Sequence, residues 1–209
     1  MSYGFQAINQ SGYVQIDQDY SNFALYTSGS ATTGTVVIVG IDLAECLVFI
    51  RLPSNKWAST DGGASFGDRF VIVPEYGAAN FTYEYRVYRY SLAFSPSTGY
   101  SLQVFRDDGS LCFDGNRDQT RIVSSNNYTL GSGLVTLASV GFNPWILANA
   151  LDFVGVQGVS PSFQSWWFYL GARVNADLTV SVNSIQTKIT GGVISVPANT
   201  GTTNILLAQ

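Results

Sequence analysis

Residues 3–17 read YGFQAINQSGYVQID, residues 100–114 read YSLQVFRDDGSLCFD, and this repeated stretch decides the fold. Nine positions of the two stretches match without a gap. The matched pairs are Tyr3 and Tyr100, Phe5 and Leu102, Gln6 and Gln103, Ala7 and Val104, Ile8 and Phe105, Gly12 and Gly109, Val14 and Leu111, Ile16 and Phe113, and Asp17 and Asp114. Each copy predicts a β-hairpin whose turn closes at the shared glycine, because that position favours a positive φ.

Two further parallels follow the hairpins in the same order. GTVVIVG at 34–40 resembles GLVTLAS at 133–139, and CLVFI at 46–50 resembles WILAN at 145–149. Such ordered self-similarity predicts an internal duplication, with a first half at 1–97 and a second half at 98–209. The turn-forming residues SPST at 95–98 separate the halves. The halves could form one domain or two.

Period-two alternation predicts strands through the rest of the chain. Phe81, Tyr83, Tyr85 and Val87 alternate with Thr82, Glu84, Arg86 and Tyr88, which is typical of a strand with one buried face. Leu178, Val180 and Val182 alternate likewise, and a bulge near Asn183 and Ser184 would explain the later phase slip. Residues 145–153 could start a helix after Pro144, but the repeat favours a strand at 145–149. We therefore predict an all-β fold of one or two antiparallel β-sandwiches.

The final apolar segment, Asn204–Leu207, is predicted to be a strand. It could complete its own sheet, or it could add to the edge of a neighbouring chain. Its own sheet is the expected place.

Composition restricts the classes of partner. Charged residues make up 11% and the net charge is −4, with no cluster of cations, which argues against nucleic acid. The apolar stretch from Val36 to Ile50 contains Asp42 and Glu45 and is too short for a membrane helix, and no secretory signal is expected. A weakly charged surface suits a subunit that packs against partners. Cys46 and Cys112 lie in apolar runs and are predicted to be reduced core residues.

The chain offers little catalytic chemistry. It contains no His, which removes the usual general base and the commonest zinc ligand, and it has no phosphate-binding glycine loop. The acids that a glycosidase would need are interpreted as solvated turn residues: Asp61, Asp68, Glu75, Glu84 and Asp152. Asp114, Asn116 and Asp118 resemble the opening of a calcium loop, but Gln119 replaces its required glycine. No enzymatic activity, cofactor or metal is predicted.

Aromatic residues supply the candidate contact sites. Trp57 lies in a polar, glycine-rich stretch with Lys56 and Asp61, where its indole could stack on a sugar, anchor a partner, or fold back onto the protein. Trp166 and Trp167 are adjacent in a predicted strand, so one of them should point away from the local core. That side chain would meet the other half or a neighbouring subunit.

The opening MSYGFQAINQSGYVQID resembles the N-termini of small tail-tip and tail-fibre proteins of tailed bacteriophages. The matching residues are Tyr3, Gly4, Phe5, Ile8, Gly12, Val14, Ile16 and Asp17. The resemblance covers about the first fifty residues and supplies no catalytic residues. It implies a non-enzymatic virion protein of the tail, made in the host cytoplasm and assembled as a symmetric homo-oligomer, with a trimer favoured over a hexamer.

Two functions are consistent with these features. The first is a structural tip, fibre or connector subunit that binds other virion tail proteins. The second is a tail module that binds a host-surface glycan or receptor through Trp57. A carboxylate-based glycan depolymerase is a distant third, and neither nucleic-acid binding nor membrane insertion is expected.

Overall fold

The computed structural model describes residues 6–8, 14–17, 23–61, 67–90, 95–129, 134–151, 154–159, 164–191 and 202–209. These residues form strands joined by turns, with two short 3-10 helices, η1 (Leu43–Glu45) and η3 (Ala148–Leu151). The predicted all-β class is confirmed. Within the described ranges, no helix has the length and hydrophobicity that crossing a membrane requires.

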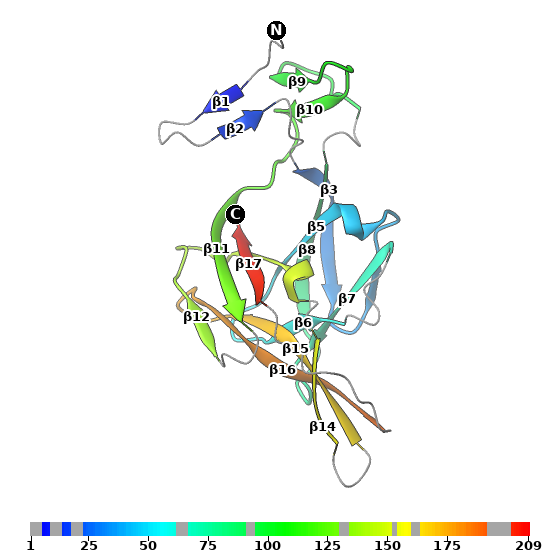
Figure 1. Ribbon diagram of the computed structural model, residues 1–209, viewed down its shortest axis with the longest axis vertical. Coiled ribbons are helices and arrows are strands. Elements are labelled where there is room, and N and C mark those ends of the chain that lie inside the picture. Colours follow the sequence, from blue (N-terminus) through cyan, green and yellow to red (C-terminus); the bar gives the residue numbers. More distant parts are fainter. Residues whose placement is uncertain are drawn as a thin grey trace.

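The strands form two large antiparallel sheets and two separate hairpins (Figure 1). The six-stranded sheet has the order β11 (Ile122–Thr129), β17 (Thr202–Ala208), β13 (Trp145–Leu147), β5 (Cys46–Arg51), β8 (Thr82–Tyr90) and β3 (Phe23–Thr32). The seven-stranded sheet has the order β12 (Val135–Leu137), β16 (Val180–Gly191), β15 (Gln164–Val174), β6 (Ala58–Thr60), β7 (Arg69–Pro74) and β4 (Val36–Ile38), with β14 (Val154–Val159) also paired to β15. The hairpins are β1 (Gln6–Ile8) with β2 (Val14–Asp17), and β9 (Gln103–Phe105) with β10 (Leu111–Asp114).

One hydrophobic core joins the two large sheets. Ile50 and Ile146 of the six-stranded sheet and Ile72 of the seven-stranded sheet are fully buried in the same cluster. Phe70 of β7 meets Tyr85 of β8 edge to face, with ring centroids 5.5 Å apart. The face of β8 that carries Tyr85 therefore packs against the seven-stranded sheet.

The two halves of the chain have corresponding strand pairings. In the first half β8 pairs with β3 and β5, and β7 pairs with β4 and β6. In the second half β17 pairs with β11 and β13, and β16 pairs with β12 and β15. The halves meet at two places, β5 with β13 and β6 with β15, and each of these joins strands in corresponding positions. The two halves thus share one pattern of strand pairing and join through equivalent strands.

The free edges of the six-stranded sheet are tied together at one end. A β-bridge pairs Ala24 of β3 with Gln119, just before β11. The Leu25 amide donates to the Asp118 carbonyl at 2.8 Å, and the Thr120 amide donates to the Phe23 carbonyl at 3.2 Å. The sheet therefore curls until its first and last strands meet.

Several local predictions are confirmed. Cys46 and Cys112 are both buried free thiols. Burial raises the pKa of the Cys46 thiol, so it packs as a small neutral residue. The C-terminal segment forms β17 in its own sheet, between β11 and β13.

Other local predictions are wrong for physical reasons. Leu178 is not in a strand; it lies in a tight turn at φ 64°, where its amide donates a hydrogen bond to the Asn175 carbonyl at 3.0 Å. The bulge of β16 lies opposite the Trp167–Phe168 step and not near Asn183. The strand at Trp145 stops at Leu147, and η3 continues the chain. Tyr88, expected on a polar face, is 2% exposed because Phe49 packs edge to face on it at 5.9 Å.

Gly171 of β15 is needed because of a close approach by Ile185 of β16. A Cβ at Gly171 would lie 2.5 Å from Ile185 Cδ1 and Cγ1. Because Ile185 is buried and cannot move aside freely, Gly171→Ala should destabilise the protein by about 2 kcal/mol. Chemical denaturation measures this. Ile185→Ala should cost less in the Gly171→Ala background than alone, and Gly115→Ala, whose nearest contact is 3.4 Å, should be nearly neutral. If the stability losses of Gly171→Ala and Ile185→Ala simply add in the double variant, the steric explanation is contradicted.

Candidate functional site

The two hairpins have the same register at the positions that the sequence repeat aligns. In β1 and β2, Gln6 pairs with Asp17, and in β9 and β10, Gln103 pairs with Asp114. The next matched positions are also paired, Ala7 with Ile16 and Val104 with Phe113, and both ladders then shift register by a bulge. The hairpins predicted from the repeat are confirmed, and they are built alike.

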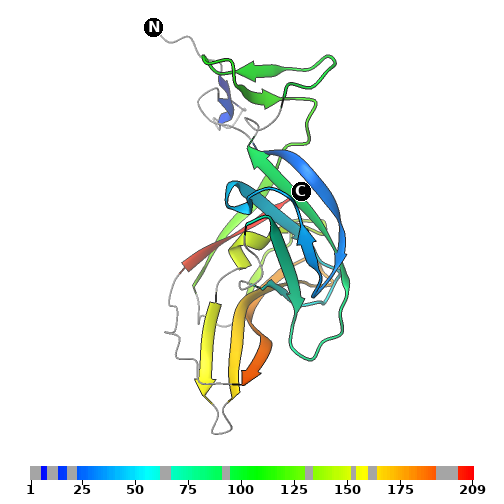
Figure 2. The same cartoon turned by 90° about the vertical axis from the view of Figure 1, so that its right-hand side faces the viewer.

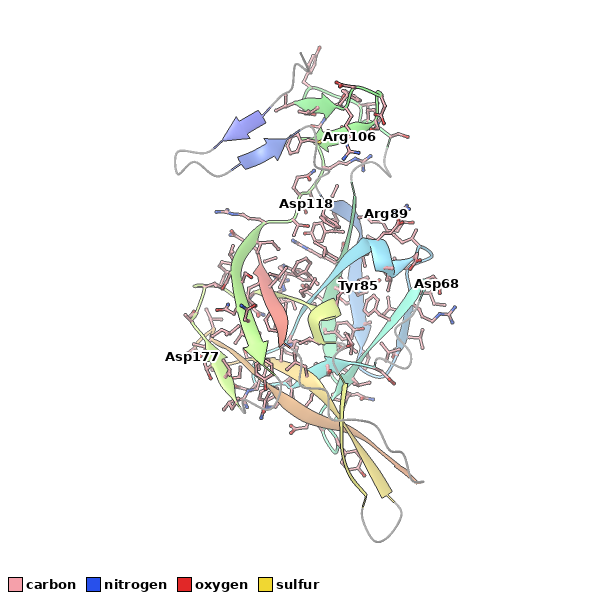
Figure 3. All side chains as sticks on the ribbon, viewed as in Figure 1. Asp68, Tyr85, Arg89, Arg106, Asp118 and Asp177 are labelled. Atoms are coloured by element: carbon pink, nitrogen blue, oxygen red, sulfur yellow. The ribbon has the colours of Figure 1, made fainter. Side chains whose placement is uncertain are left out.

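Both hairpins project from the same end of the molecule. They lie side by side beyond the two large sheets (Figures 1 and 2). Asp118 lies where this end joins the sheets, and Arg106 lies within the projecting part (Figure 3). Because β3 and β11 begin side by side at the bridge, the hairpins that precede them emerge together. We call the projecting part, comprising β1, β2, β9, β10 and the loops 95–102 and 115–118, the hairpin end.

The tip of the β9–β10 hairpin is held by local hydrogen bonds. The Asp108 carboxylate accepts from the Ser110 amide at 2.8 Å and from the Ser110 hydroxyl at 2.6 Å, and these bonds lower its pKa. Gly109 adopts φ 81°, as predicted for the residue that closes the turn. Its counterpart Gly12 lies outside the described residues. The tip thus has a defined shape without packing on the body.

Asp114 is the centre of a buried polar network at the base of this hairpin. Its side chain is 0% exposed. Its carboxylate accepts from the Ser97 amide and hydroxyl at 2.8 and 2.9 Å, the Asn116 amide at 3.0 Å, the Ser101 hydroxyl at 3.2 Å and the Gln103 amide group at 3.3 Å. Burial alone would raise the pKa of Asp114, but the bonds from Ser97, Asn116 and Ser101 outweigh it and lower the pKa to about 2. The network fixes loop 95–102 against the hairpin.

Apolar side chains are exposed on the hairpin end. Tyr100 is fully exposed, Leu102 is 50% exposed and Phe105 is 41% exposed. The sequence repeat places Tyr3, Phe5 and Ile8 at the matching positions of the first hairpin. Exposed apolar groups gathered at one end are typical of a binding surface. The sequence repeat marks these positions as equivalent in the two hairpins. The period-two alternation of the sequence does not show that their side chains face solvent.

The structure does not bring the candidates Trp57, Lys56 and Asp61 into one site. Trp57 is half-buried, and the Arg173 guanidinium lies 4.9 Å from its ring centroid. Lys56 is exposed, and Asp61 follows the opposite end of β6, where its amide donates to the Val71 carbonyl. The cation over the indole limits the ring surface that a sugar could reach. A contact role for these three residues stays a prediction.

Trp166 and Trp167 lie in β15, between β14 and β16. Trp166 pairs with Gln157 and Ile189, and Trp167 pairs with Val156 and Lys188. The side chains of both tryptophans lie outside the described residues, as does Asp152. Their predicted role in an interface stays a prediction.

Two of the acidic candidates pair with arginines, and Glu84 lies within β8 and not in the turn that was expected. Asp68 pairs with Arg69, and Glu84 pairs with Arg51. The Asp114 carboxylate faces donors, so the calcium-loop interpretation does not fit it. Across the described part of the chain, no three Asp, Glu or Cys side chains gather closely enough to hold a metal ion.

No protein-family model, curated protein or solved structure matches this chain.

Proposed function

We propose that this protein is an architectural subunit that assembles through its hairpin end. The observation that carries the proposal is the pair of like hairpins projecting from one end, with Tyr100, Leu102 and Phe105 exposed. A surface built this way can bind neighbouring subunits by burying apolar area. The proposal assigns the molecule a binding role and no catalytic one.

The matched pairings support the proposed internal duplication. Hairpins, sheet positions and even the bulges of β3 and β11 recur in both halves, at Leu25–Thr27 and Ile122–Ser124. A duplicated chain carries two copies of one contact surface. Such a chain suits an assembly that needs two equal contacts from each subunit.

We place this assembly in the tail of a bacteriophage virion, as a tip, fibre or connector subunit. The support is the resemblance of the opening residues, from Tyr3 to Asp17, to tail proteins, together with the 11% content of charged residues. The partners would be other tail proteins and further copies of the chain, with a trimer favoured over a hexamer. Mass spectrometry of purified virions tests this placement, and absence from the particle would contradict it.

Light scattering tests assembly directly. We expect a mass that is a multiple of the 22.6 kDa chain. Combining Tyr100→Ser, Leu102→Ser and Phe105→Ser removes one of the two proposed contact surfaces and should lower the mass, since truncating such contacts weakens association at least about 100-fold. A matched control replaces three exposed apolar residues elsewhere, Ile38, Tyr76 and Leu134, by serine and should stay assembled. A monomeric wild-type protein, or a hairpin variant with the same mass as the wild-type assembly, would contradict the proposal.

A further inference from the structure

A polar hollow lies over β3, β5, β8 and β13, away from the hairpin end. One part has a volume of about 260 Å³ and is lined by residues that include Ser28, Ser30, Arg86 and Trp145. An adjoining part of about 210 Å³ is lined by residues that include Tyr83 and Asn143. Arg51 and Glu84 line both parts. The hollow therefore combines charged, hydroxyl and amide groups from four strands and one loop.

Trp145 anchors the cationic wall of the hollow. The Arg86 guanidinium lies 4.4 Å from its ring centroid, and that of Arg51 lies 4.8 Å away. The ring holds both cations in place by cation–π attraction, and Trp145 itself is only 6% exposed. Arg51 is paired with Glu84, whereas Arg86 has no carboxylate partner among the described residues and bonds the Tyr88 hydroxyl at 3.3 Å. The hollow thus offers one guanidinium that is free to bind an anion.

One buried polar atom beside the hollow has no partner within the described structure, the side-chain carbonyl oxygen of Asn143. The amide group of the same side chain donates to the Leu52 carbonyl at 3.3 Å, which fixes the orientation of Asn143. Buried polar groups are normally hydrogen-bonded, so this orphaned oxygen is consistent with a group that a ligand satisfies.

The fold itself does not require this cluster. Arg86 lies opposite Ser28 on β3, and at the corresponding place of the second half Leu206 lies opposite Ser125. Glu84 lies opposite Ser30, and its counterpart Asn204 lies opposite Asn127. The second half builds the same strand pairings with neutral residues. The charges of the first half are therefore additions to a scaffold that forms without them.

We propose that this hollow binds a carboxylated saccharide. Arg86 would bind the carboxylate, because a guanidinium presents a fork of donors that matches it. Ser28, Ser30 and the Glu84 carboxylate would bind sugar hydroxyls, and Asn143 would accept from one. A neutral sugar would leave Arg86 without its anion, and a simple carboxylate would leave the hydroxyl-binding groups unused. This site is independent of the proposed assembly at the hairpin end.

Titration of the wild-type protein with glucuronate, glucose and acetate, followed by NMR, tests the proposal. We expect glucuronate to bind with a Kd of roughly 1 mM, and glucose and acetate to bind at least about tenfold more weakly. The serine variant of Tyr100, Leu102 and Phe105 should bind glucuronate as the wild type does, so failure of assembly and failure of this site are distinguishable. Equal binding of acetate or glucose, or no binding of glucuronate, would overturn the proposal.

Variants that copy the second half locate the site. Arg86→Leu installs the residue of the counterpart position and should weaken glucuronate binding at least about tenfold. Because this variant also loses the contact with Trp145, Ser28→Ala provides a milder change with a matched control, Ser125→Ala. Both serines are exposed on corresponding strands, so only Ser28→Ala should weaken binding. Undiminished binding by Arg86→Leu, or equal losses in the two serine variants, would overturn the assignment.

Discussion

Replacing Asp114 with asparagine should destabilise the hairpin end by about 3 kcal/mol, because it breaks a buried network built around one charge. The carboxylate accepts from Ser97, Ser101, Gln103 and Asn116, whereas an asparagine turns one of its two acceptors into a donor that faces other donors. Hydrogen exchange of the Ser97 and Asn116 amides reports this directly, since both donate to the carboxylate. Their exchange should accelerate by about 100-fold.

The control for this change is Asp108→Asn. Asp108 bonds Ser110 at the exposed tip of the same hairpin, so its replacement should affect the turn and leave the Ser97 amide protected. Unchanged protection of Ser97 in Asp114→Asn would show that the network does not hold the loop.

The same network predicts how the stability of the hairpin end depends on pH. The pKa of Asp114 is about 2 in the folded protein and 3.8 when unperturbed. A lowered folded pKa means that the stabilisation is fully present above about pH 4 and is lost as the pH falls towards about 2. Protection of the Ser97 amide should therefore fall over this range in the wild type. In Asp114→Asn it should stay low and nearly constant, since that side chain does not titrate.

Local chemistry explains which parts of this fold could be predicted from sequence. The β9–β10 hairpin depends on a turn closed by Asp108, Gly109 and Ser110, which are neighbours in the chain. Repetition of the same pattern at 3–17 then located the second copy. The repeat aligns Asp17 with Asp114, but only the folded loop 95–102 shows that Asp114 is buried.

Contacts between distant strands explain the errors. Tyr88 follows the polar side of an alternating strand, yet Phe49 of the next strand covers it. Polar residues surround Trp57 in sequence and predict an exposed indole, whereas Arg173 from another part of the chain lies over its ring. The hollow was missed for the same reason, since Arg51, Arg86 and Trp145 come from three strands that only the sheet order brings together. An alignment of β8 with β17 places Glu84 and Arg86 opposite Asn204 and Leu206, so it would have shown both charges as unmatched.

Phe49→Ala should lower the free energy of unfolding of the whole molecule by about 4 kcal/mol, the typical cost of truncating a fully buried phenylalanine. Phe49 is 0% exposed and lies directly opposite Leu147, at the place where β5 of the first half pairs with β13 of the second. Strand pairings on either side of this contact correspond, since β5 also pairs with β8 and β13 also pairs with β17. If the shared sheets make the two halves one cooperative unit, Phe49→Ala must lower the stability of both halves. Denaturation followed by tryptophan fluorescence and by circular dichroism should give one coincident transition, shifted by the same amount.

Leu147→Ala supplies the matched variant, with an expected cost of about 3 kcal/mol. The two side chains are cross-strand neighbours. The double variant should therefore lose less free energy of unfolding than the two single variants together, with a coupling of about 1 kcal/mol. A truncation within one half, at Ile72 of β7, should shift the same single transition without coupling to Leu147. Two separate transitions, or a Phe49→Ala effect confined to one probe, would mean that each half folds by itself and that the sheets merely abut. Cooperative unfolding would instead make the β5–β13 contact a condition for presenting both hairpins together, since they emerge from strands that belong to the same sheet.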